Sequence, residues 1–223
     1  MWITNTDRPG LKRNFIFPGR PDCIEGTDTQ RRLFAKGREL FADGDPARFV
    51  YRVVRGAVRT STLLPDARRQ IHSFLFADEI FGFESTDRHS CTADAIQETV
   101  VETFRASDFN SLVGSSPVLA DELIMALMAS LERARGQMLM LARRDSREKL
   151  AIFLLELAAR LNTDRLELVM SRADIADHLG MTRETVSRTL TSLARDGLIF
   201  LECAPCVILS DKKGLRRILL AER

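Results

Sequence analysis

Residues 171 to 193 place apolar side chains at the three- and four-residue spacing of two short amphipathic helices. The inward positions are Ile175, Ala176, Leu179, Val186, Leu190 and Leu193. Gly180 stands between the two helices, and glycine readily adopts the left-handed conformation that ends a helix. The pattern therefore predicts a helix-turn-helix unit.

Polar residues mark the start of both predicted helices. Ser171 and Asp174 form a capping-box pattern, in which the hydroxyl accepts from the third backbone amide and the acid complements the positive end of the helix. Thr182 has the side chain of an N-cap for the second helix.

The outward face of the second helix carries groups that suit DNA bases. After Thr182, the outward positions near its start are Arg183, Glu184, Ser187 and Arg188. Arginine donates to guanine and glutamate accepts from cytosine, so this face suits the major groove. The alternative is a plain helical hairpin with a solvated charged face.

A different pattern, of short apolar runs separated by turn residues, occupies residues 32 to 109. Strand-like runs rich in β-branched and aromatic residues cover 49–54, 57–63, 69–76 and 99–104. Many short strands joined by glycine-rich turns predict an antiparallel barrel or sandwich.

A long helix is predicted to start at residues 115–117. Its apolar residues repeat as a heptad seam made of Ala120, Ile124, Leu127, Leu131, Ala134, Met138 and Leu141. Leu123, Met128 and Met140 widen the apolar surface beyond this seam. We therefore expect the helix to cover its own barrel and to pair with a second copy of the chain.

The remaining segments predict a second domain. A hinge at 143–145 precedes an apolar helix over 149–161, with Ser146 as its N-cap, and a short strand follows over 166–170. Beyond the helix-turn-helix unit, strands at 198–202 and 206–210 form a β-hairpin, and a helix over 213–221 closes the chain. A hairpin beside the second helix makes the domain a winged helix.

These patterns divide the 223 residues into an N-terminal arm (1–25), a β domain (26–116), a dimerisation helix (117–143) and a winged-helix domain (144–223). The net charge is +2, and its mild basic excess after Arg143 adds only a little support for a nucleic-acid partner. No apolar run approaches the roughly 18–20 residues of a membrane helix, and the first residues lack the features of a secretion signal. We therefore expect a cytoplasmic protein with a mobile arm and no membrane contact.

From about residue 30 onward, the chain resembles the Crp/Fnr family of transcription regulators. The resemblance rests, in the family's order, on GRELFADGDPARFVYRVVRGAVR, RRQIHSFLFADEIFG, the long helix and ADIADHLGMTRETVSRTLTSLARDGLI. It implies an α+β fold with an N-terminal antiparallel β-roll of the cyclic-nucleotide-binding type, a long dimerisation helix and a C-terminal winged helix-turn-helix domain.

The resemblance also implies a function. Glu184, Ser187 and Arg188 match the base-reading residues of the Fnr and FixK branch, whose members bind palindromes with TTGAT half-sites, and REKLAIFLLELAARL resembles the same helix in FixK-like proteins. Such proteins are homodimeric activators that recruit RNA polymerase to genes for low-oxygen respiration, nitrogen fixation or denitrification. Arg183 departs from the apolar or small residue of the Fnr branch and resembles the Crp branch, so a different half-site is the alternative.

Cofactor sites known in this family match the chain poorly. A cyclic nucleotide needs a Gly-Glu pair and an Arg-Ser pair, whereas the matching segments are 78–82 and 88–91. Asp78 replaces a flexible residue with an acid, and Arg88 is not followed directly by serine. We therefore expect no cyclic AMP site.

An iron–sulfur cluster needs four converging thiolates, but only Cys23 lies in the arm and Cys91 is far from it. His72 and His89 are candidate haem ligands, although isolated histidines are more often core or loop residues. We expect a FixK-type regulator without a cofactor. A haem-gated or small-ligand-gated regulator is the alternative.

Cys203 and Cys206 form a C-x-x-C pair at the tip of the predicted wing. Such a pair is either redox active or half of a zinc site, and no further zinc ligands are placed nearby. Oxidation beside DNA would weaken docking. The alternative is an indifferent pair of thiols in a cytosolic hairpin.

An enzyme is the competing class, because small β-barrels also host metal oxygenases. Those enzymes need clustered histidines and carboxylates, whereas this chain has three histidines and one of them, His178, belongs to the helix-turn-helix unit. The sequence contains no nucleophile elbow, P-loop or dinucleotide fingerprint. We therefore expect neither a catalytic nor a metal site.

Overall fold

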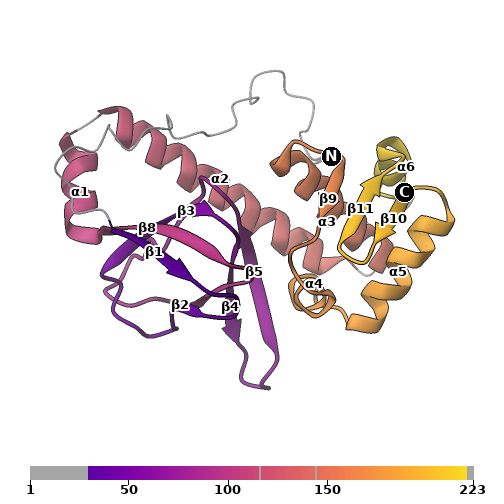
Figure 1. Cartoon of the computed structure of the whole chain (residues 1–223), viewed down its shortest axis with the longest axis horizontal. Helices are drawn as coiled ribbons and strands as arrows, with labels where there is room; N and C mark the ends of the chain where they lie inside the picture. Colours follow the sequence, from indigo (N-terminus) through magenta and orange to yellow (C-terminus); the bar gives the residue numbers. More distant parts are fainter. Residues whose placement is uncertain (1–29, 116, 144, 220–223) are drawn as a thin grey trace.

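A computed structural model describes residues 30–115, 117–143 and 145–219. These residues form a β domain, a long helix and a small C-terminal domain, which is the α+β arrangement that the sequence predicted (Figure 1). The predicted arm, residues 1–25, lies outside the described residues.

The β domain contains two four-stranded antiparallel sheets. Its strands are β1 (Gln30–Phe34), β2 (Glu39–Phe41), β3 (Phe49–Arg55), β4 (Val58–Leu63), β5 (Arg69–Leu75), β6 (Ile80–Phe81), β7 (Thr92–Ala95) and β8 (Thr99–Arg105). One sheet has the order β1-β8-β3-β6 and the other β2-β7-β4-β5. The four predicted runs correspond to β3, β4, β5 and β8, whereas the other strands, of two to five residues, are too short to show an alternating pattern.

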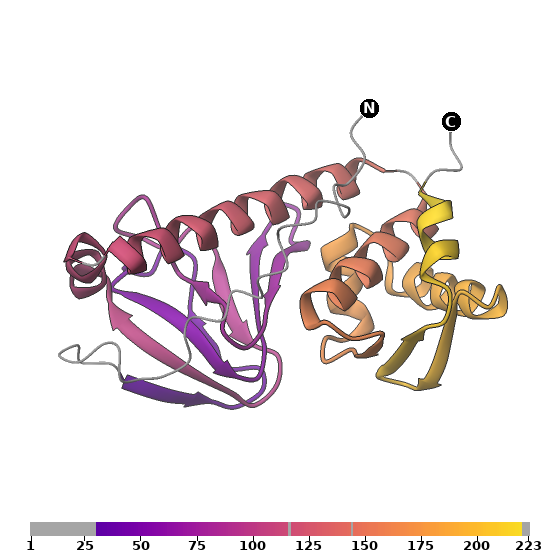
Figure 2. The same cartoon turned by 90° about the horizontal axis from the view of Figure 1, so that it is seen from above.

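Two helices follow the β domain. The short α1 (Ala106–Ser115) was not predicted, and α2 (Pro117–Ala142) is the long helix expected from the heptad pattern. Figure 2 shows α2 lying along one face of the β domain and continuing to the C-terminal domain. None of the helices in the described part of the chain combines the length and apolar character needed to cross a bilayer.

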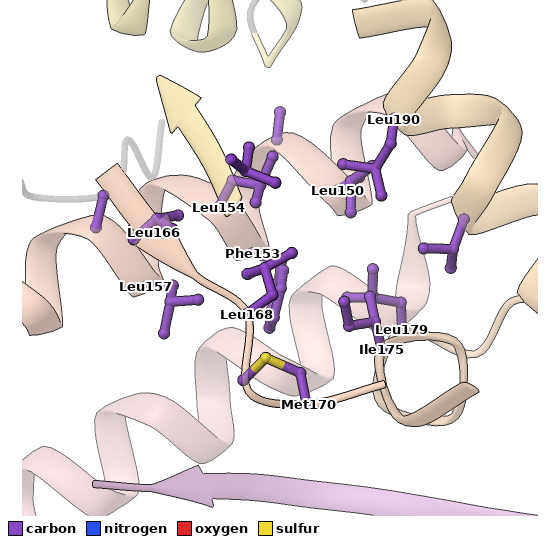
Figure 3. Close-up of a cluster of buried hydrophobic side chains, with 14 of the residues drawn as sticks. Leu150, Phe153, Leu154, Leu157, Leu166, Leu168, Met170, Ile175, Leu179 and Leu190 are labelled. Atoms are coloured by element: carbon purple, nitrogen blue, oxygen red, sulfur yellow. The ribbon is translucent and has the colours of Figure 1, made fainter. Parts of the chain in front are cut away.

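The C-terminal domain comprises α3 (Ser146–Leu161), β9 (Arg165–Glu167), α4 (Arg172–Leu179), α5 (Arg183–Arg195), β10 (Ile199–Cys203), β11 (Cys206–Leu209) and α6 (Lys212–Ile218). Its three strands form an antiparallel sheet in the order β10-β11-β9. Helices and sheet enclose one apolar core, which contains Leu150 and Leu154 of α3 together with Ile175 and Leu179 of α4 (Figure 3). This core fixes the positions of α4 and α5.

Two details of the prediction were wrong. The N-cap of α3 is Asp145 and not Ser146, because the Asp145 carboxylate accepts from the backbone N–H of Arg147 at 2.6 Å. The strand predicted over 166–170 ends at Glu167, since the backbone N–H of Leu168 turns to the carbonyl of Pro205. Of the residues expected to widen the apolar surface of α2, Met140 is buried in the core that contains Leu150 and Leu154 of α3.

Candidate nucleic-acid interface

The turn between α4 and α5 has the geometry that the sequence signals predict. Ser171 caps α4 in a capping box: its Oγ accepts from the Asp174 N–H at 3.1 Å, and its own N–H donates to Asp174 Oδ2 at 3.0 Å. Gly180 ends the helix with φ of 60°. Thr182 then caps α5, because its Oγ1 accepts from the Thr185 N–H at 3.1 Å. The unit is therefore a helix-turn-helix with hydrogen-bonded ends.

The two faces of α5 differ sharply. Val186, Leu190 and Leu193 are buried in the core, as predicted. On the outward face, the exposed residues are Arg183, Glu184, Ser187 and Arg188. None of these four side chains makes a hydrogen bond or an ion pair with another residue that the structure describes. Thr182, in contrast, uses its hydroxyl in the cap, so its contribution is to set the start of α5.

Polar contacts from α3 hold α4 and α5 in place. Arg147 donates to Ser192 Oγ at 2.6 Å and pairs with Asp196 at 2.6 Å, at the C-terminal end of α5. Lys149 is buried, and its Nζ donates to the carbonyl of Leu179 at 3.0 Å, in the last turn of α4. A cation at this position also complements the negative end of the helix.

One face of α4 packs against the β domain through partly buried ion pairs. Arg59 of β4 and Arg69 of β5 both bond Asp174 Oδ1, at 2.6 and 2.8 Å. Arg69 also bonds Asp177 at 2.7 Å. Burial alone would raise the pKa of Asp174, but the hydrogen bonds from Ser171 and the charges of both arginines hold it below its ordinary value. Asp174 therefore stays ionised and links the two domains.

His178 lies at the same domain junction. Its Nδ1 is 3.1 Å from the carbonyl of Ile71, and Gln137 of α2 donates to its backbone carbonyl at 2.7 Å. The ring also packs on Phe74 and Phe153. Burial lowers the pKa of His178 to about 4, so the imidazole is neutral at physiological pH and donates from Nδ1.

The wing stands beside α5 and reaches the start of α4. The guanidinium of Arg172, at the first position of α4, lies 3.5 Å from the carbonyl of Ala204 in the wing turn. Its Nη1 is buried and has no partner among the described residues. Arg172 was not among the site residues predicted from the sequence, because no helical spacing or motif distinguishes it from a solvated basic residue.

The predicted dimer seam lies largely on the surface of α2. Four of its apolar side chains are strongly exposed, namely Ile124 (55 %), Leu127 (46 %), Leu131 (45 %) and Met138 (63 %). Ala134 is also exposed, while Leu141 is half-buried against the core of the C-terminal domain. The opposite side of the helix turns inward, because Leu123 packs on the β domain near Val50 and Phe104.

Aromatic side chains fill the interior of the β domain. His89 is buried and stacks on Phe41, with ring centroids 3.6 Å apart, and Tyr51 and Phe81 complete the cluster. The Nδ1 of His89 lies 3.4 Å from a carboxylate oxygen of Glu84. These contacts make His89 a core residue of the β domain.

The residues compared with a nucleotide site also make internal contacts. Arg88 donates to the carbonyl of Gly44 at 2.6 Å, and Ser90 Oγ donates to Glu84 at 3.0 Å. Asp78 occupies a left-handed turn position with φ of 70°. The phosphate ligands expected of a cyclic-nucleotide site are thus bonded within the protein.

The other candidate ligands lie in different surroundings. His72 is exposed on β5, whereas His89 is buried. Burial, together with the charges of Glu84 and Asp43, raises the pKa of the Cys91 thiol to about 11. Within the described ranges, no group of three or more His, Cys, Asp or Glu side chains is arranged to hold a metal ion. Cys23 lies outside those ranges.

Two family models match the chain. Residues 148–218 match the Crp-like helix-turn-helix domain, and residues 31–116 match the cyclic nucleotide-binding domain. Together with the capped helix-turn-helix unit and its exposed α5 face, these matches define a class. The chain belongs to the Crp/Fnr family of DNA-binding transcription regulators and is not an enzyme.

Within the family, the chain is FixK-like. It is 41 % identical over 192 residues to the nitrogen fixation regulation protein FixK of Azorhizobium caulinodans, covering 83 % of this chain and 77 % of the relative. It is 38 % identical to FixK of Rhizobium meliloti, over 83 % of this chain and 85 % of that protein. The solved structure of FixK2 from Bradyrhizobium japonicum superposes with a TM-score of 0.80 at 36 % identity, covering 85 % and 96 % of the two chains.

Proposed function

We propose that the chain binds palindromic DNA as a homodimer, with one α5 in the major groove of each half-site. The observation that carries this proposal is the outward face of α5, where four polar side chains are exposed and make no bond to another described residue. A rigid helix that presents unpaired donors and acceptors is suited to contact base edges.

Each residue of this face has a proposed role. In a TTGAT half-site, the single G·C pair offers guanine acceptors to Arg188 and the cytosine amino group to Glu184. Ser187 lies on the same face and donates to or accepts from a neighbouring base. Arg183, in the first turn, reaches a phosphate or a base edge, and Thr182 sets the entry of the helix.

Dimerisation through α2 supplies the second half-site. One recognition helix reads only about five base pairs, so specific binding needs two half-sites about one helical turn apart. The exposed side chains of Ile124, Leu127, Leu131 and Met138 form an apolar stripe at heptad spacing, which favours a coiled-coil seam with a second copy. Ala134 and Leu141 complete the proposed seam.

The relatives support a biological role for the dimer. Three of them carry the name nitrogen fixation regulation protein, and others are named transcriptional activators or activatory proteins. We therefore propose an activator of low-oxygen respiration, nitrogen fixation or denitrification genes, with RNA polymerase as its protein partner. An activator of chromosomal genes in a bacterium acts in the cytoplasm.

The test is a gel-shift titration with a TTGAT-N4-ATCAA duplex and a scrambled duplex of equal length. We expect specific retardation of the first duplex at moderate salt, and a dimeric mass by light scattering. Leu131→Glu should yield monomers that lose the specific complex, whereas Leu139→Glu, which introduces the same charge at an exposed position outside the seam, should remain a dimer. Equal binding of both duplexes by the wild-type chain would contradict the proposal.

A second candidate function, gating by a small ligand, is favoured by one cavity. It has a volume of about 350 Å³ and lies between β5, α2, α3 and α4, where Phe74, Arg133, Phe153 and His178 contribute to its lining. Pockets of this size accept small organic ligands, and this one adjoins both domains. An absorption spectrum with metal analysis of the purified protein tests for haem, and thermal-shift screening tests for other ligands. A Soret band with stoichiometric iron would favour the second candidate.

A further inference from the structure

The wing ends in a tight turn flanked by two cysteines. Cys203 ends β10 and Cys206 begins β11, and they are register partners in the antiparallel ladder. Opposed residues of such a ladder have Cα atoms about 4.5–5.5 Å apart. This separation lies within the range of roughly 4.4–6.8 Å that disulfides span. The two cysteines are therefore close enough to form a disulfide without a change of strand pairing.

The two thiols have different environments. Cys203 is exposed to solvent, whereas Cys206 is buried. The neighbouring Cys203 thiol raises the pKa of Cys206, so the Cys206 thiol stays protonated. Cys203 is the thiol that dissolved oxidants can reach. Arg165, which pairs with Glu202, lies 4.0 Å from Cys206 Sγ and adds a cation beside the thiols.

The turn between the cysteines is bonded to the start of the helix-turn-helix unit. The carbonyl of Pro205 accepts from the N–H of Leu168 at 2.7 Å, and that of Ala204 lies 3.5 Å from Arg172 Nη2. Leu168 and Arg172 stand on either side of the Ser171 cap. In helix-turn-helix proteins the first helix crosses the DNA backbone, so the wing turn supports a segment that lies next to DNA.

We propose that Cys203 and Cys206 form a reversible disulfide in the presence of hydrogen peroxide, and that this bond lowers the affinity for DNA; the second part rests on the proposed function. The Cys203 thiolate attacks one peroxide oxygen and becomes a sulfenic acid, and the other oxygen leaves as hydroxide, which takes up a proton to form water. The Cys206 thiol then displaces water from the sulfenic sulfur. Two thiols lose two electrons and two protons, and peroxide becomes two molecules of water.

The geometry of the bond explains the loss of affinity. A disulfide holds the two Cβ atoms about 3.8 Å apart, whereas opposed Cβ atoms of an antiparallel pair lie about 4.5–5.5 Å apart. Oxidation therefore draws the strand ends together and shifts the turn between them. The carbonyls of Ala204 and Pro205 move relative to Arg172 and Leu168, and the start of α4 loses support.

The experiment treats the full chain with hydrogen peroxide and follows mass and DNA affinity on the same samples. Trypsin releases both cysteines in one peptide, Asp196–Lys212, so the disulfide appears as a loss of two hydrogens from that peptide. We expect this loss, and a weakening of binding to the TTGAT duplex on the order of tenfold, equal to about 1.4 kcal/mol. A dithiol reductant should restore both. Cys203→Ser, Cys206→Ser and the double variant should bind DNA like the reduced wild type and should not respond to peroxide.

Each outcome is decisive for one part of the proposal. An Asp196–Lys212 peptide that keeps its reduced mass would overturn the disulfide. A disulfide that leaves affinity unchanged, or an equal loss in the double variant, would overturn its effect on DNA binding. If the reduced protein does not distinguish the two duplexes, the proposed function fails while the peptide mass still tests the disulfide. Cys91→Ser serves as the matched control, since its thiol is half-buried with a raised pKa and the peroxide response should persist without it.

Discussion

The two helices of the helix-turn-helix unit use their polar residues in opposite ways. On α4, Asp174, Asp177 and His178 all turn toward the β domain and bond Arg59, Arg69 and the carbonyl of Ile71. On α5, the side chains of Arg183, Glu184, Ser187 and Arg188 are exposed to solvent and make no bond to another described residue. One helix anchors the domain and the other is free to bind.

This difference separates stability from recognition. Changes on α4 should alter how firmly the C-terminal domain is held, and should leave base preference unchanged. Changes on the outward face of α5 should alter DNA binding and leave the free energy of unfolding within about 0.5 kcal/mol of the wild type.

The largest effect is expected from Asp174→Ala. The substitution removes the carboxylate half of the capping box of α4. It also removes the buried carboxylate that Arg59 and Arg69 both bond at the domain junction. Caps contribute about 0.5–2 kcal/mol and breaking a buried pair costs about 3–5 kcal/mol. Because Arg59 and Arg69 keep Asp94 and Asp177 as partners, we expect the free energy of unfolding to fall by about 3–4 kcal/mol in urea titrations.

The matched control is Asp177→Ala. Asp177 is about one-third exposed, pairs with Arg69 and belongs to no cap, so its loss should cost no more than about 1 kcal/mol. Equal losses from the two variants would show that Asp174 has no special anchoring role.

On the outward face of α5, Arg188→Ala should weaken binding to the TTGAT duplex by about 1–3 kcal/mol. The loss should be much smaller on the scrambled duplex, because a base contact is lost and not only a phosphate contact. Arg195→Ala removes the same charge from the last turn of α5, where the side chain is also exposed, and should have little effect. Fluorescence anisotropy at two salt concentrations measures the DNA affinity of both variants. If Arg188→Ala lost the same affinity for both duplexes, Arg188 would contact phosphate and not a base.

Acid should destabilise the contact between α4 and the β domain through the protonation of His178. The unfolded chain protonates this imidazole near pH 6.5, whereas the folded chain does so only near pH 4, so the unfolded state gains protons and stability falls as pH drops between these values. One pKa unit corresponds to about 1.4 kcal/mol. At pH 5.5 the wild type should therefore lose about 1.4 kcal/mol relative to pH 7.5 through this residue.

His178→Gln should remove this part of the pH dependence, which urea titrations at the two pH values measure. The substitution keeps a side chain that donates hydrogen bonds and does not titrate. A variant that loses as much stability at pH 5.5 as the wild type would assign the acid sensitivity to other groups.

The smallest effect should come from Glu184→Ala. Glutamate accepts from cytosine and repels other acceptors, so its removal relaxes base choice more than it lowers affinity. We expect the preference for the G·C pair over other pairs at that position to fall by about 1 kcal/mol, in titrations of single-substituted duplexes. An unchanged preference would place Glu184 outside the base contacts.

Local signals predicted the helix-turn-helix unit well. The effects of Ser171, Gly180 and Thr182 involve only residues a few positions away in the chain. Each of the three occupies the cap or turn position that its residue type predicts. The buried face of α5 follows from spacing alone. The N-cap of α3 was misassigned because Asp145 and Ser146 are both good caps. The helix α1 was not predicted because it contains Gly114 and only scattered apolar residues.

The ion pairs that hold α4 against the β domain could not be predicted from the sequence pattern. Arg59 and Asp174 are separated by 115 positions, and charged residues on a strand and a helix normally suggest solvated faces. Lys149 is another example, since it lies near the start of the apolar helix α3 and is nevertheless buried, where its Nζ donates to the carbonyl of Leu179. Such pairs depend on how two domains meet, and periodicity within either domain contains no information about that contact.

The ion pairs between β5 and α4 have a consequence for the operator itself. In the proposed dimer, each recognition helix is fixed to its own β domain, and the two β domains are joined through α2. The distance between the two recognition helices is then set by the protein fold and does not adapt to the DNA. Adding one base pair between the half-sites shifts them by about 3.4 Å and rotates them by about 35°. An anchored dimer should therefore discriminate operators by spacer length as well as by base sequence.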